Sequence, residues 1–338
     1  MLQSFPRPRP TTNPYVVQLC AALPPEVAVR FFRWRTAILG RYDVLHLHWP
    51  ENLLHGRDGV RRALRRALLL SLLARLAATR TGVVRTVHNT EPHESLRRVD
   101  AWLLARLEAR TTRWVRLNPF TSTPDTARTR TVLHGHYRDW YAVSTLPARV
   151  PGRLLIFGLL RPYKGVEALT AAFQDLEDPG LSLHVVGALS GGDSSGPLTS
   201  RLHDDAAADV RIQLRLGHAR DDDLVREIGE AMVVVLPYHR IHNSGAALLA
   251  LSLGRAVLVP RSPVTEALAD EVGSKWVHFF DGDLSAEDLR RCLQRDTPPT
   301  APDLGRREWD SAGHAHEAVY RAAATRASAR WGGTSGVA

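Results

Sequence analysis

The chain has 338 residues, of which 44% are hydrophobic and 23% are charged, a composition typical of a folded globular protein and not of a disordered one. Its length suffices for two domains of ordinary size. The formal net charge of +9 favours acidic partners such as phosphates, nucleic acid or anionic lipid. Cys20 and Cys292 match no zinc-site spacing and indicate a reducing compartment.

The N-terminus lacks the apolar core of a signal peptide. The longest apolar run, at residues 67–74, is too short to span a bilayer. We therefore expect a cytoplasmic protein and leave open a peripheral contact with the inner face of the membrane.

The N-terminal stretch predicts two short strands, a helix and then a strand that ends in polar residues. We expect strands at residues 2–5 and 27–34, and a helix at 15–23 that follows a Pro-rich loop at 6–14. Residues 42–47 are the next predicted strand. His48, Trp49 and Glu51 follow its carboxyl end, where open α/β sheets bind their ligands. His46 is interpreted as a core histidine, whereas for His48 a structural and a functional interpretation both stay open.

A basic helix is predicted between Arg57 and Arg80, with arginines at i,i+4 spacing and leucines between them. In one interpretation this helix lies on a membrane surface and attracts anionic lipid. In the other it is a layer helix whose leucines face the sheet and whose arginines face water. The two interpretations are compatible if the layer helix also presents its basic residues to a membrane.

The densest cluster of titratable groups follows the strand predicted at residues 82–89. It consists of His88, Glu91, His93 and Glu94. Imidazole and carboxylate groups at a strand end are candidates for a general base. The alternative is a polar surface loop that caps the helix expected near residues 99–110.

The N-terminal half closes with strands predicted at residues 113–117 and 131–137. His134 and His136 lie at the exit of the second of these strands. Residues 141–151 then have the composition of a linker.

Residues 154–157 form a short apolar run typical of a parallel strand that is buried on both faces. Gly158 allows a sharp turn, and Arg161 and Lys164 then precede Gly165 and a helix at 166–173. The N-terminus of a helix carries a partial positive charge, so cations there are poorly placed unless a phosphate binds. Lys164 is one of two lysines in the chain, which suits a site that needs a compact charge, although chance retention is an alternative.

A second anion site is predicted after the apolar strand at residues 231–237. Asn243 and Ser244 are good N-caps for a helix at 246–253, and the amides of Ser244 and Gly245 would approach an anion closely. An ordinary capped helix is the alternative. Glu266 lies on a short helix at 263–270, and a final helix is expected at 309–326.

The alternation of strands and helices predicts an α/β fold with two Rossmann-like domains. The stretches at residues 158–165 and 237–254 make the chain resemble the GT-B fold glycosyltransferases, especially glycosyltransferase family 4 and its relatives. That resemblance implies two βα domains facing a cleft and a C-terminal helix that crosses back. We expect an acceptor-binding domain at 1–145, a nucleotide-sugar-binding domain at 146–305 and the crossing helix at 306–330.

The resemblance also implies a donor site. In this superfamily an Arg and a Lys after the first strand of the C-terminal domain bind the donor diphosphate, together with a glycine-containing loop before a later helix. The residues that take these places here are Gly158, Arg161, Lys164, Asn243, Ser244 and Gly245. Glu266 falls where relatives carry an acidic residue in the next loop.

One departure from family 4 bears on the mechanism. Its members usually carry two glutamates separated by seven residues, and here Ile241 and Leu249 stand at those positions. We therefore expect an inverting reaction in which a base from the His/Glu cluster of the N-terminal half deprotonates the acceptor. Neither the stretch at residues 158–165 nor that at 237–254 carries an Asp-x-Asp metal motif, so we expect protein cations in place of a metal, and no cofactor.

A narrower resemblance rests on the stretches DVLHLHWPE, TVHNTEPHE and VLHGHY. They are similar to bacterial enzymes that transfer a sugar, often mannose from GDP-mannose, to a lipid-linked or glycan acceptor. This implies a hexosyltransferase of polysaccharide biosynthesis that acts on a glycan, glycolipid or small-molecule acceptor. The residues expected to bind the acceptor are Asn13, His48, Trp49, Glu51, His134 and His136.

Two other kinds of function stay open. One is a different GT-B enzyme, such as a nucleotide-sugar epimerase or a phosphorylase. The other is a catalytically silent basic protein that binds a membrane or nucleic acid. We expect no nucleic acid as a partner, because no recognised nucleic-acid motif accompanies the basic helix.

Overall fold

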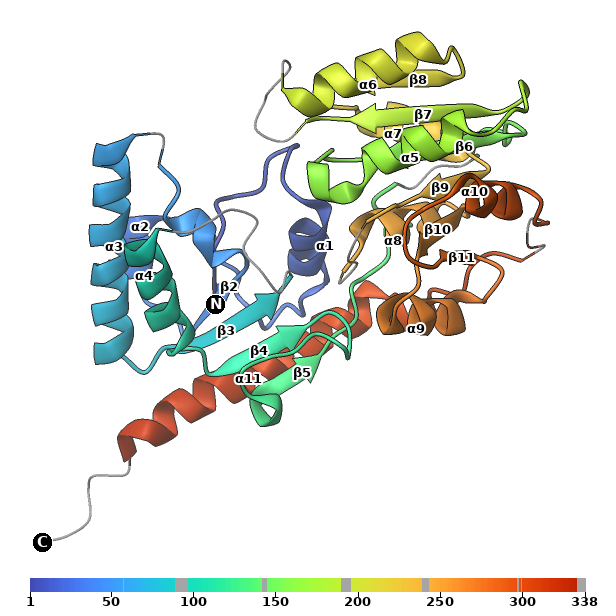
Figure 1. Cartoon of the computed structure of the whole chain (residues 1–338). Coiled ribbons are helices and arrows are strands. Elements are labelled where there is room, and N and C mark those ends of the chain that lie inside the picture. Colours follow the sequence, from blue (N-terminus) through green and yellow to red (C-terminus); the bar gives the residue numbers. More distant parts are fainter. Residues whose placement is uncertain are drawn as a thin grey trace, which may run out of the picture. The chain divides into compact units, whose positions relative to one another are not determined.

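The computed structural model describes residues 1–56, 58–88, 97–141, 145–189, 196–238, 243–296, 298 and 300–332. The chain divides into two compact units (Figure 1). The N-terminal unit comprises residues 1–135 together with 307–338, and the C-terminal unit comprises residues 136–306. None of the described helices combines the length and hydrophobicity that a membrane span requires.

A five-stranded parallel sheet with the order β1-β2-β3-β4-β5 forms the centre of the N-terminal unit. Its strands are β1 (Leu2–Gln3), β2 (Val44–Leu47), β3 (Gly82–Val87), β4 (Arg113–Arg116) and β5 (Thr129–Thr131). Helices α2 (Trp34–Leu39), α3 (Gly59–Ala78) and α4 (Arg98–Glu108) cover one face. The opposite face is covered by α1 (Pro14–Ala22) and α11 (Trp309–Gly332). Short 3-10 helices η1 (Pro50–Leu53) and η2 (Thr126–Arg128) lie in its connections.

Helix α11 returns from the end of the chain to the first sheet, so the expected crossing helix is confirmed (Figure 1). The packing is close at two glycines. A Cβ atom on Gly82 would lie 2.7 Å from the carbonyl oxygen of Ala323, and one on Gly313 would overlap that of Ala22. Small residues therefore let α11 approach both β3 and α1.

Two predicted strands differ from the structure. Residues 27–34 form no strand, and Arg30 makes only an isolated bridge to Leu2. The Phe32 N–H donates to the Phe5 carbonyl at 2.8 Å, and the prolines at 6, 8 and 10 that follow have no backbone N–H with which to extend the pairing. The strand predicted at 131–137 is β5, which ends at Thr131, so the residues after it are its exit.

The basic helix α3 does not divide into leucines on the sheet and arginines in water. Leu69, Leu72 and Leu76 are buried as expected. The arginines, however, lie on the flanks of the helix. Arg66 donates to Asp100 of α4 at 2.7 Å, and Arg75 donates to the Gly40 carbonyl at 2.7 Å.

What α3 exposes is mostly apolar. Leu64 and Leu70 of this helix are 58% and 48% exposed. The exposed side chains along it are Val60, Arg61, Ala63, Leu64, Ala67, Leu70, Ser71, Ala74, Ala77 and Ala78. Among the charged side chains of α3, Arg61 is exposed, whereas Arg62, Arg65, Arg66 and Arg75 are only partly exposed.

A six-stranded parallel sheet with the order β11-β10-β9-β6-β7-β8 forms the centre of the C-terminal unit. Its strands are β6 (Arg153–Phe157), β7 (Ser182–Gly187), β8 (Ile212–Leu216), β9 (Val233–Val235), β10 (Ala256–Pro260) and β11 (Val277–Phe280). Helices α5 (Val166–Gln174), α6 (Pro197–Ala208) and α10 (Ala286–Leu293) lie on one face. The other face carries α7 (Asp221–Glu230), α8 (Gly245–Ser252) and α9 (Pro263–Val272). The 3-10 helices are η3 (Pro162–Lys164) and η5 (Gly305–Arg307).

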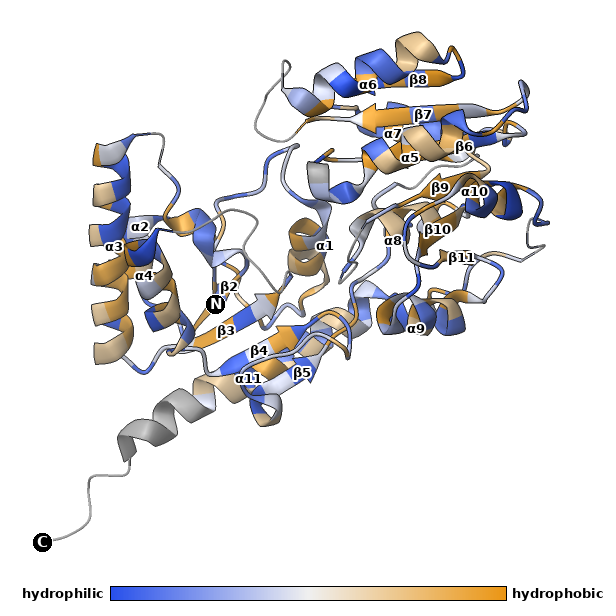
Figure 2. Ribbon diagram, viewed as in Figure 1, coloured by the Kyte–Doolittle hydropathy of each residue, from blue (hydrophilic) through white to orange (hydrophobic). Residues whose placement is uncertain are grey.

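The central strands of this sheet are apolar on both faces (Figure 2). In β6, Leu154 and Ile156 face one helical layer, and Leu155 and Phe157 face the other. Each such buried side chain contributes about 1.5–3 kcal/mol relative to exposure. β9 lies next to β6, so the chain reverses its direction of winding between these two strands. In open α/β sheets, ligands bind beyond the carboxyl ends of the strands at such a switch point.

Candidate active site

The predicted diphosphate-binding residues lie on the loops that leave β6 and β9, on either side of the switch point. Gly158 has φ of +101°, and Gly165, which begins α5, has φ of +66°. A Cβ atom on Gly165 would overlap the carbonyl oxygen of Pro237, which follows β9. The exit of β6 and the exit of β9 are therefore in direct contact.

Two cations follow β6 at this switch point. Lys164 Nζ lies 5.1 Å from the centre of the Tyr238 ring, and the Arg161 guanidinium lies 5.9 Å from that of Tyr163. Burial, and then the neighbouring Arg161, lower the pKa of Lys164 to about 8. Within the described part of the chain neither cation has a carboxylate partner. A bound anion would relieve the repulsion between them.

The N-terminus of α8 follows the other loop of the switch point, which leaves β9. Ser244 caps this helix, and its Oγ accepts from the N–H of Ala247 at 3.1 Å. Gly245 follows, and a Cβ atom there would lie 3.1 Å from the Tyr137 hydroxyl. No acidic residue lies in the first turn of α8. Asn243, just before the cap, is half-buried. The helix is thus capped, and the positive end of its dipole has no acidic neighbour in its own first turn.

Two residues that the resemblance singled out have other surroundings. Glu266 is exposed and pairs with Arg261 at 3.3 Å. Leu249 is buried in the core of the C-terminal unit, where no donor hydroxyl reaches it. Ile241 lies outside the described residues.

The N-terminal unit brings His48 and His88 together at the ends of β2 and β3. His48 Nδ1 lies 2.9 Å from His88 Nε2. The Trp49 ring stacks on His88, with ring centres 4.0 Å apart and planes 20° from parallel. Trp49 has φ of +37°, and no other described non-glycine residue has a positive φ. The strained turn after β2 thus holds an aromatic ring against an imidazole.

His46 is a core histidine, as the sequence indicated. Its Nε2 lies 2.8 Å from the Thr86 hydroxyl, and its Nδ1 lies 2.8 Å from the hydroxyl of Tyr320 on α11. Both ring nitrogens therefore have partners inside the unit, so His46 holds α11 against the sheet.

Five histidines of this unit have lowered pKa values and are neutral near pH 7, namely His46, His48, His88, His134 and His316. Burial lowers the pKa of His48 to about 3 and those of His134 and His316 to about 4. Burial and the neighbouring imidazoles hold the pKa values of His46 and His88 well below the usual range. His88 is nevertheless partly exposed, so its ring combines a neutral state with access to solvent.

The other predicted acceptor residues are dispersed. Asn13 caps α1, and its Oδ1 accepts from the N–H of Tyr15 at 2.9 Å. Glu51 is half-buried in η1. His134 is buried, with its ring centre 4.8 Å from that of Tyr15. His136 is buried and belongs to the C-terminal unit.

Three of the candidate bases, Glu91, His93 and Glu94, lie outside the described residues. Among the described residues no group of three or more His, Cys, Asp or Glu side chains is arranged to hold a metal ion. The sequence did not identify three residues that contact the predicted ones: Gln3 contacts His48, Tyr238 lies beside Lys164, and Tyr320 contacts His46. One sequence signal was available for Tyr320, because its i,i+4 spacing from His316 places both side chains on the same face of the last helix.

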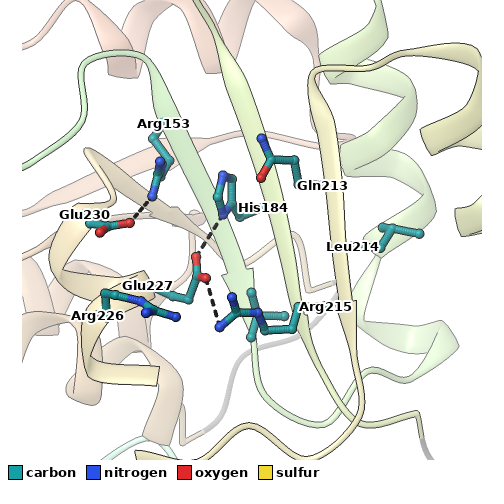
Figure 3. Close-up of a pocket in the computed structure, with 9 residues that line it drawn as sticks. Arg153, His184, Gln213, Leu214, Arg215, Arg226, Glu227 and Glu230 are labelled. Carbon is teal, nitrogen blue, oxygen red and sulfur yellow. Dashed lines mark hydrogen bonds and ion pairs between the residues drawn. The ribbon is translucent and has the colours of Figure 1, made fainter. Parts of the chain in front are cut away.

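A polar pocket of about 450 Å³ opens elsewhere in the C-terminal unit, beside β6, β7, β8 and α7. His184 pairs with Glu227 at 2.8 Å, Arg215 with the same carboxylate at 3.4 Å, and Arg153 with Glu230 (Figure 3). These two arginines already have carboxylate partners, whereas none is described for Arg161 and Lys164. The pocket is therefore the weaker candidate for an anion.

Comparison with known proteins identifies relatives of this chain. No protein-family model matches the chain. Two curated proteins of Xanthomonas campestris pv. campestris are 44% identical to it over 324 residues, which is 95% of this chain and 91% of each relative. Both are named GDP-mannose:glycolipid 4-beta-D-mannosyltransferase.

Solved structures share the fold at low identity. Anabaena HepE in complex with UDP has a TM-score of 0.59 and 12% identity, with 98% of each chain covered. AviGT4, a glycosyltransferase involved in avilamycin A biosynthesis, has a TM-score of 0.57 and 14% identity, with 96% of this chain and 97% of that chain covered.

Proposed function

The chain belongs to the GT-B glycosyltransferases, in the family of the Xanthomonas GDP-mannose:glycolipid 4-beta-D-mannosyltransferases, and from this premise we propose that it transfers mannose from GDP-mannose to a hydroxyl of a glycolipid. The observation that carries the proposal is the pair of cations Arg161 and Lys164 after β6, at the switch point of the C-terminal sheet, with no carboxylate partner for either cation among the described residues. The N-terminus of α8, which follows the exit of β9, has no acidic residue in its first turn.

In this reaction the bond between the anomeric carbon and the β-phosphate oxygen breaks, and negative charge grows on the departing GDP. Lys164 and Arg161 stabilise that charge, and the amides at the start of α8 donate to it. Gly165 holds the loops after β6 and β9 together, because its missing side chain lets them touch. These contacts become stronger as negative charge develops on the departing GDP. They therefore stabilise the transition state more than the bound donor, which lowers the barrier to transfer.

The stereochemistry calls for a base. The mannosyl bond of GDP-mannose is α, and a β product therefore requires inversion in a single displacement. As the acceptor oxygen attacks the anomeric carbon, its proton passes to a base on the acceptor side. We assign this role to His88, which is neutral, partly exposed and placed at the carboxyl end of β3. Trp49, stacked on His88, offers an apolar surface for the acceptor sugar.

The donor assignment is tested by thermal stability in the presence of GDP, UDP, ADP, dTDP and their sugars. A ligand at 100 times its dissociation constant stabilises the folded protein by about 2.7 kcal/mol. We expect a shift with GDP and GDP-mannose that Lys164→Ala removes. Lys275→Ala, at the other and exposed lysine, is the matched control and keeps the shift. Equal shifts in both variants would overturn the assignment.

The same protein distinguishes the rival activities. A transferase releases GDP only when a glycolipid acceptor is present. An epimerase would instead isomerise the sugar without an acceptor. Salt-dependent binding of nucleic acid, with no response to any nucleoside diphosphate, would point to a silent binding protein.

We further propose that the predicted helix between Arg57 and Arg80 makes a peripheral contact with the membrane that holds the glycolipid. Its outer surface is apolar, and the neighbouring α4 exposes Val99 and Trp102 at 53% and 49%. Arg106 packs over the Trp102 ring at 5.1 Å, so a cation lies beside the aromatic side chain. An exposed apolar surface with basic residues at its edge fits the headgroup region of an anionic bilayer.

Vesicle sedimentation tests this contact. We expect binding to vesicles of phosphatidylglycerol and phosphatidylcholine, weaker binding to phosphatidylcholine alone, and a loss at high salt. The double variant Leu64→Glu and Trp102→Glu is expected to reduce partitioning about tenfold or more. Val210→Glu, at an equally apolar side chain that is 89% exposed in the other unit, is the control. Unchanged partitioning of the double variant would refute the proposal.

A further inference from the structure

We propose that Tyr238 is a positioning residue of the donor site, and that its aromatic face holds the Lys164 ammonium in the charged form where the diphosphate of GDP-mannose binds. The inference rests on the proposed function, in which Lys164 stabilises the departing GDP. It adds the reason why this cation lies beside an aromatic ring and not beside a carboxylate.

The backbone brings the two side chains together. Lys164 is the last residue of η3, and its N–H donates to the Arg161 carbonyl at 2.9 Å. The next residue, Gly165, has no side chain to overlap the carbonyl oxygen of Pro237. Tyr238 follows Pro237 directly. The close approach of Gly165 and Pro237 therefore places the lysine before the one next to the tyrosine after the other.

The ammonium lies within the range of a cation–π interaction. Lys164 Nζ is 5.1 Å from the centre of the Tyr238 ring, and such contacts extend to about 6 Å. Gly158 bounds the same space, because a Cβ atom there would lie 3.9 Å from Nζ. Tyr238 is buried in the core of the C-terminal unit, so the orientation of its ring is fixed by packing. Arg161 has a similar neighbour, since its guanidinium lies 5.9 Å from the centre of the Tyr163 ring.

Two influences on the charge of Lys164 oppose each other. Burial and the neighbouring Arg161 favour the neutral amine and lower its pKa to about 8. The negative face of the aromatic ring favours the ammonium. The Tyr238 hydroxyl does not act as an anion, because burial and the neighbouring Tyr163 raise its pKa above the usual value. The titratable groups described around Lys164 are thus Arg161 and Tyr163 from its own segment and Tyr238 from the exit of β9.

An aromatic face suits this position better than a carboxylate. A carboxylate would hold the ammonium more tightly, but it would also repel the incoming diphosphate. The ring is neutral, and it attracts a cation less strongly than a phosphate does. Lys164 therefore stays charged in the free protein and is released to the diphosphate when the donor binds.

The direct test uses the small number of lysines in the chain. Lysine labelled with ¹³C at Cε gives signals from Lys164 and Lys275 only, and Lys275→Ala assigns them. In the free wild type we expect the ε-protons of Lys164 at higher field than those of Lys275, together with a nuclear Overhauser effect to the Tyr238 ring. The absence of both would overturn the inference, and this measurement needs no variant at position 238.

Titration of the same signals provides the second test. Tyr238→Leu keeps an apolar side chain and removes the ring, so we expect it to lower the pKa of Lys164 by about 0.5 to 1 unit. Tyr238→Phe keeps the ring and is the matched control, with an unchanged pKa. The Lys275 signal is the internal reference in each protein. A Lys164 pKa that is the same in Tyr238→Leu as in the wild type would overturn the inference.

Binding of GDP separates this role from a purely structural one. We expect Tyr238→Leu to bind GDP about 2- to 5-fold more weakly than the wild type at pH 8. At pH 6.5, where Lys164 is mostly charged in both proteins, we expect their affinities to agree within about 1.5-fold. An equal loss at both pH values would mean that Tyr238 only packs against its neighbours, and it would overturn the inference.

The outcomes also separate the inference from the proposed function. If the wild type binds no GDP, the proposed donor site fails, and the titration of the free protein still decides whether the ring holds the charge. If the wild type binds GDP and Tyr238→Leu leaves the Lys164 pKa unchanged, the inference fails and the proposed function stands.

Discussion

Raising the pH is expected to weaken the binding of GDP through the deprotonation of Lys164. In the free protein, burial and Arg161 hold its pKa at about 8, against a usual value of 10.5. A bound diphosphate favours the cation and returns the pKa towards or above that usual value. Binding therefore takes up a proton between the free and the bound pKa. The affinity is highest below pH 8 and falls as the pH rises through that value.

The size of the effect follows from the free pKa. At pH 7 nearly all Lys164 is charged, and at pH 9 about one molecule in ten is, so the association constant falls about tenfold between these pH values. Isothermal titration calorimetry in two buffers of different ionisation enthalpy measures both the affinity and the proton uptake. Titration of guanine itself is common to all variants and cancels in their comparison.

The control variants decide the interpretation. Lys275→Ala is expected to keep the full pH dependence, whereas Lys164→Ala binds GDP weakly at every pH and takes up no proton from this site. The same slope in Lys164→Ala as in the wild type would refute the assignment of the titrating group. A pH-independent affinity in the wild type would refute the contact between Lys164 and the diphosphate.

Three further predictions concern stability and the two sites. Lys164→Met is expected to raise the melting temperature of the free protein at pH 7 while abolishing GDP binding, because it removes a buried cation beside Arg161; a lower melting temperature would contradict this. Gly165→Ala is expected to lower the free energy of unfolding by about 1–3 kcal/mol in urea and to abolish GDP binding, since its φ is +66° and its Cβ would overlap the Pro237 carbonyl. Gly254→Ala, with φ of +63° in open space, is the control and keeps GDP binding. Tyr320→Phe leaves a buried His46 nitrogen without its partner and is expected to cost about 1–3 kcal/mol in the same assay, and no loss would mean that this bond does not hold α11.

The sequence predicted the local elements well where adjacent residues determine them. The apolar runs that became β6 and β9 gave the buried strands, because parallel strands covered on both faces need apolar residues in sequence. The Ser244 cap of α8 and the place of Lys164 just before α5 were evident from neighbouring residues alone. The prediction of a strand at residues 27–34 was wrong. The residues alternate as in a strand, but they pair with β1 at one bridge only, and the prolines that follow β1 offer no further N–H groups.

The sequence by itself determined that this is a two-unit α/β protein with cations at the exit of one strand and titratable side chains at the exits of others. Only the tertiary structure decided which exits meet. The contact of Gly165 with Pro237 depends on β9 lying beside β6, and the bond from Gln3 to His48 depends on the pairing of β1 with β2. These partners are far apart in the chain, and their approach is set by sheet order and register, which follow from packing of the whole unit and not from any local pattern.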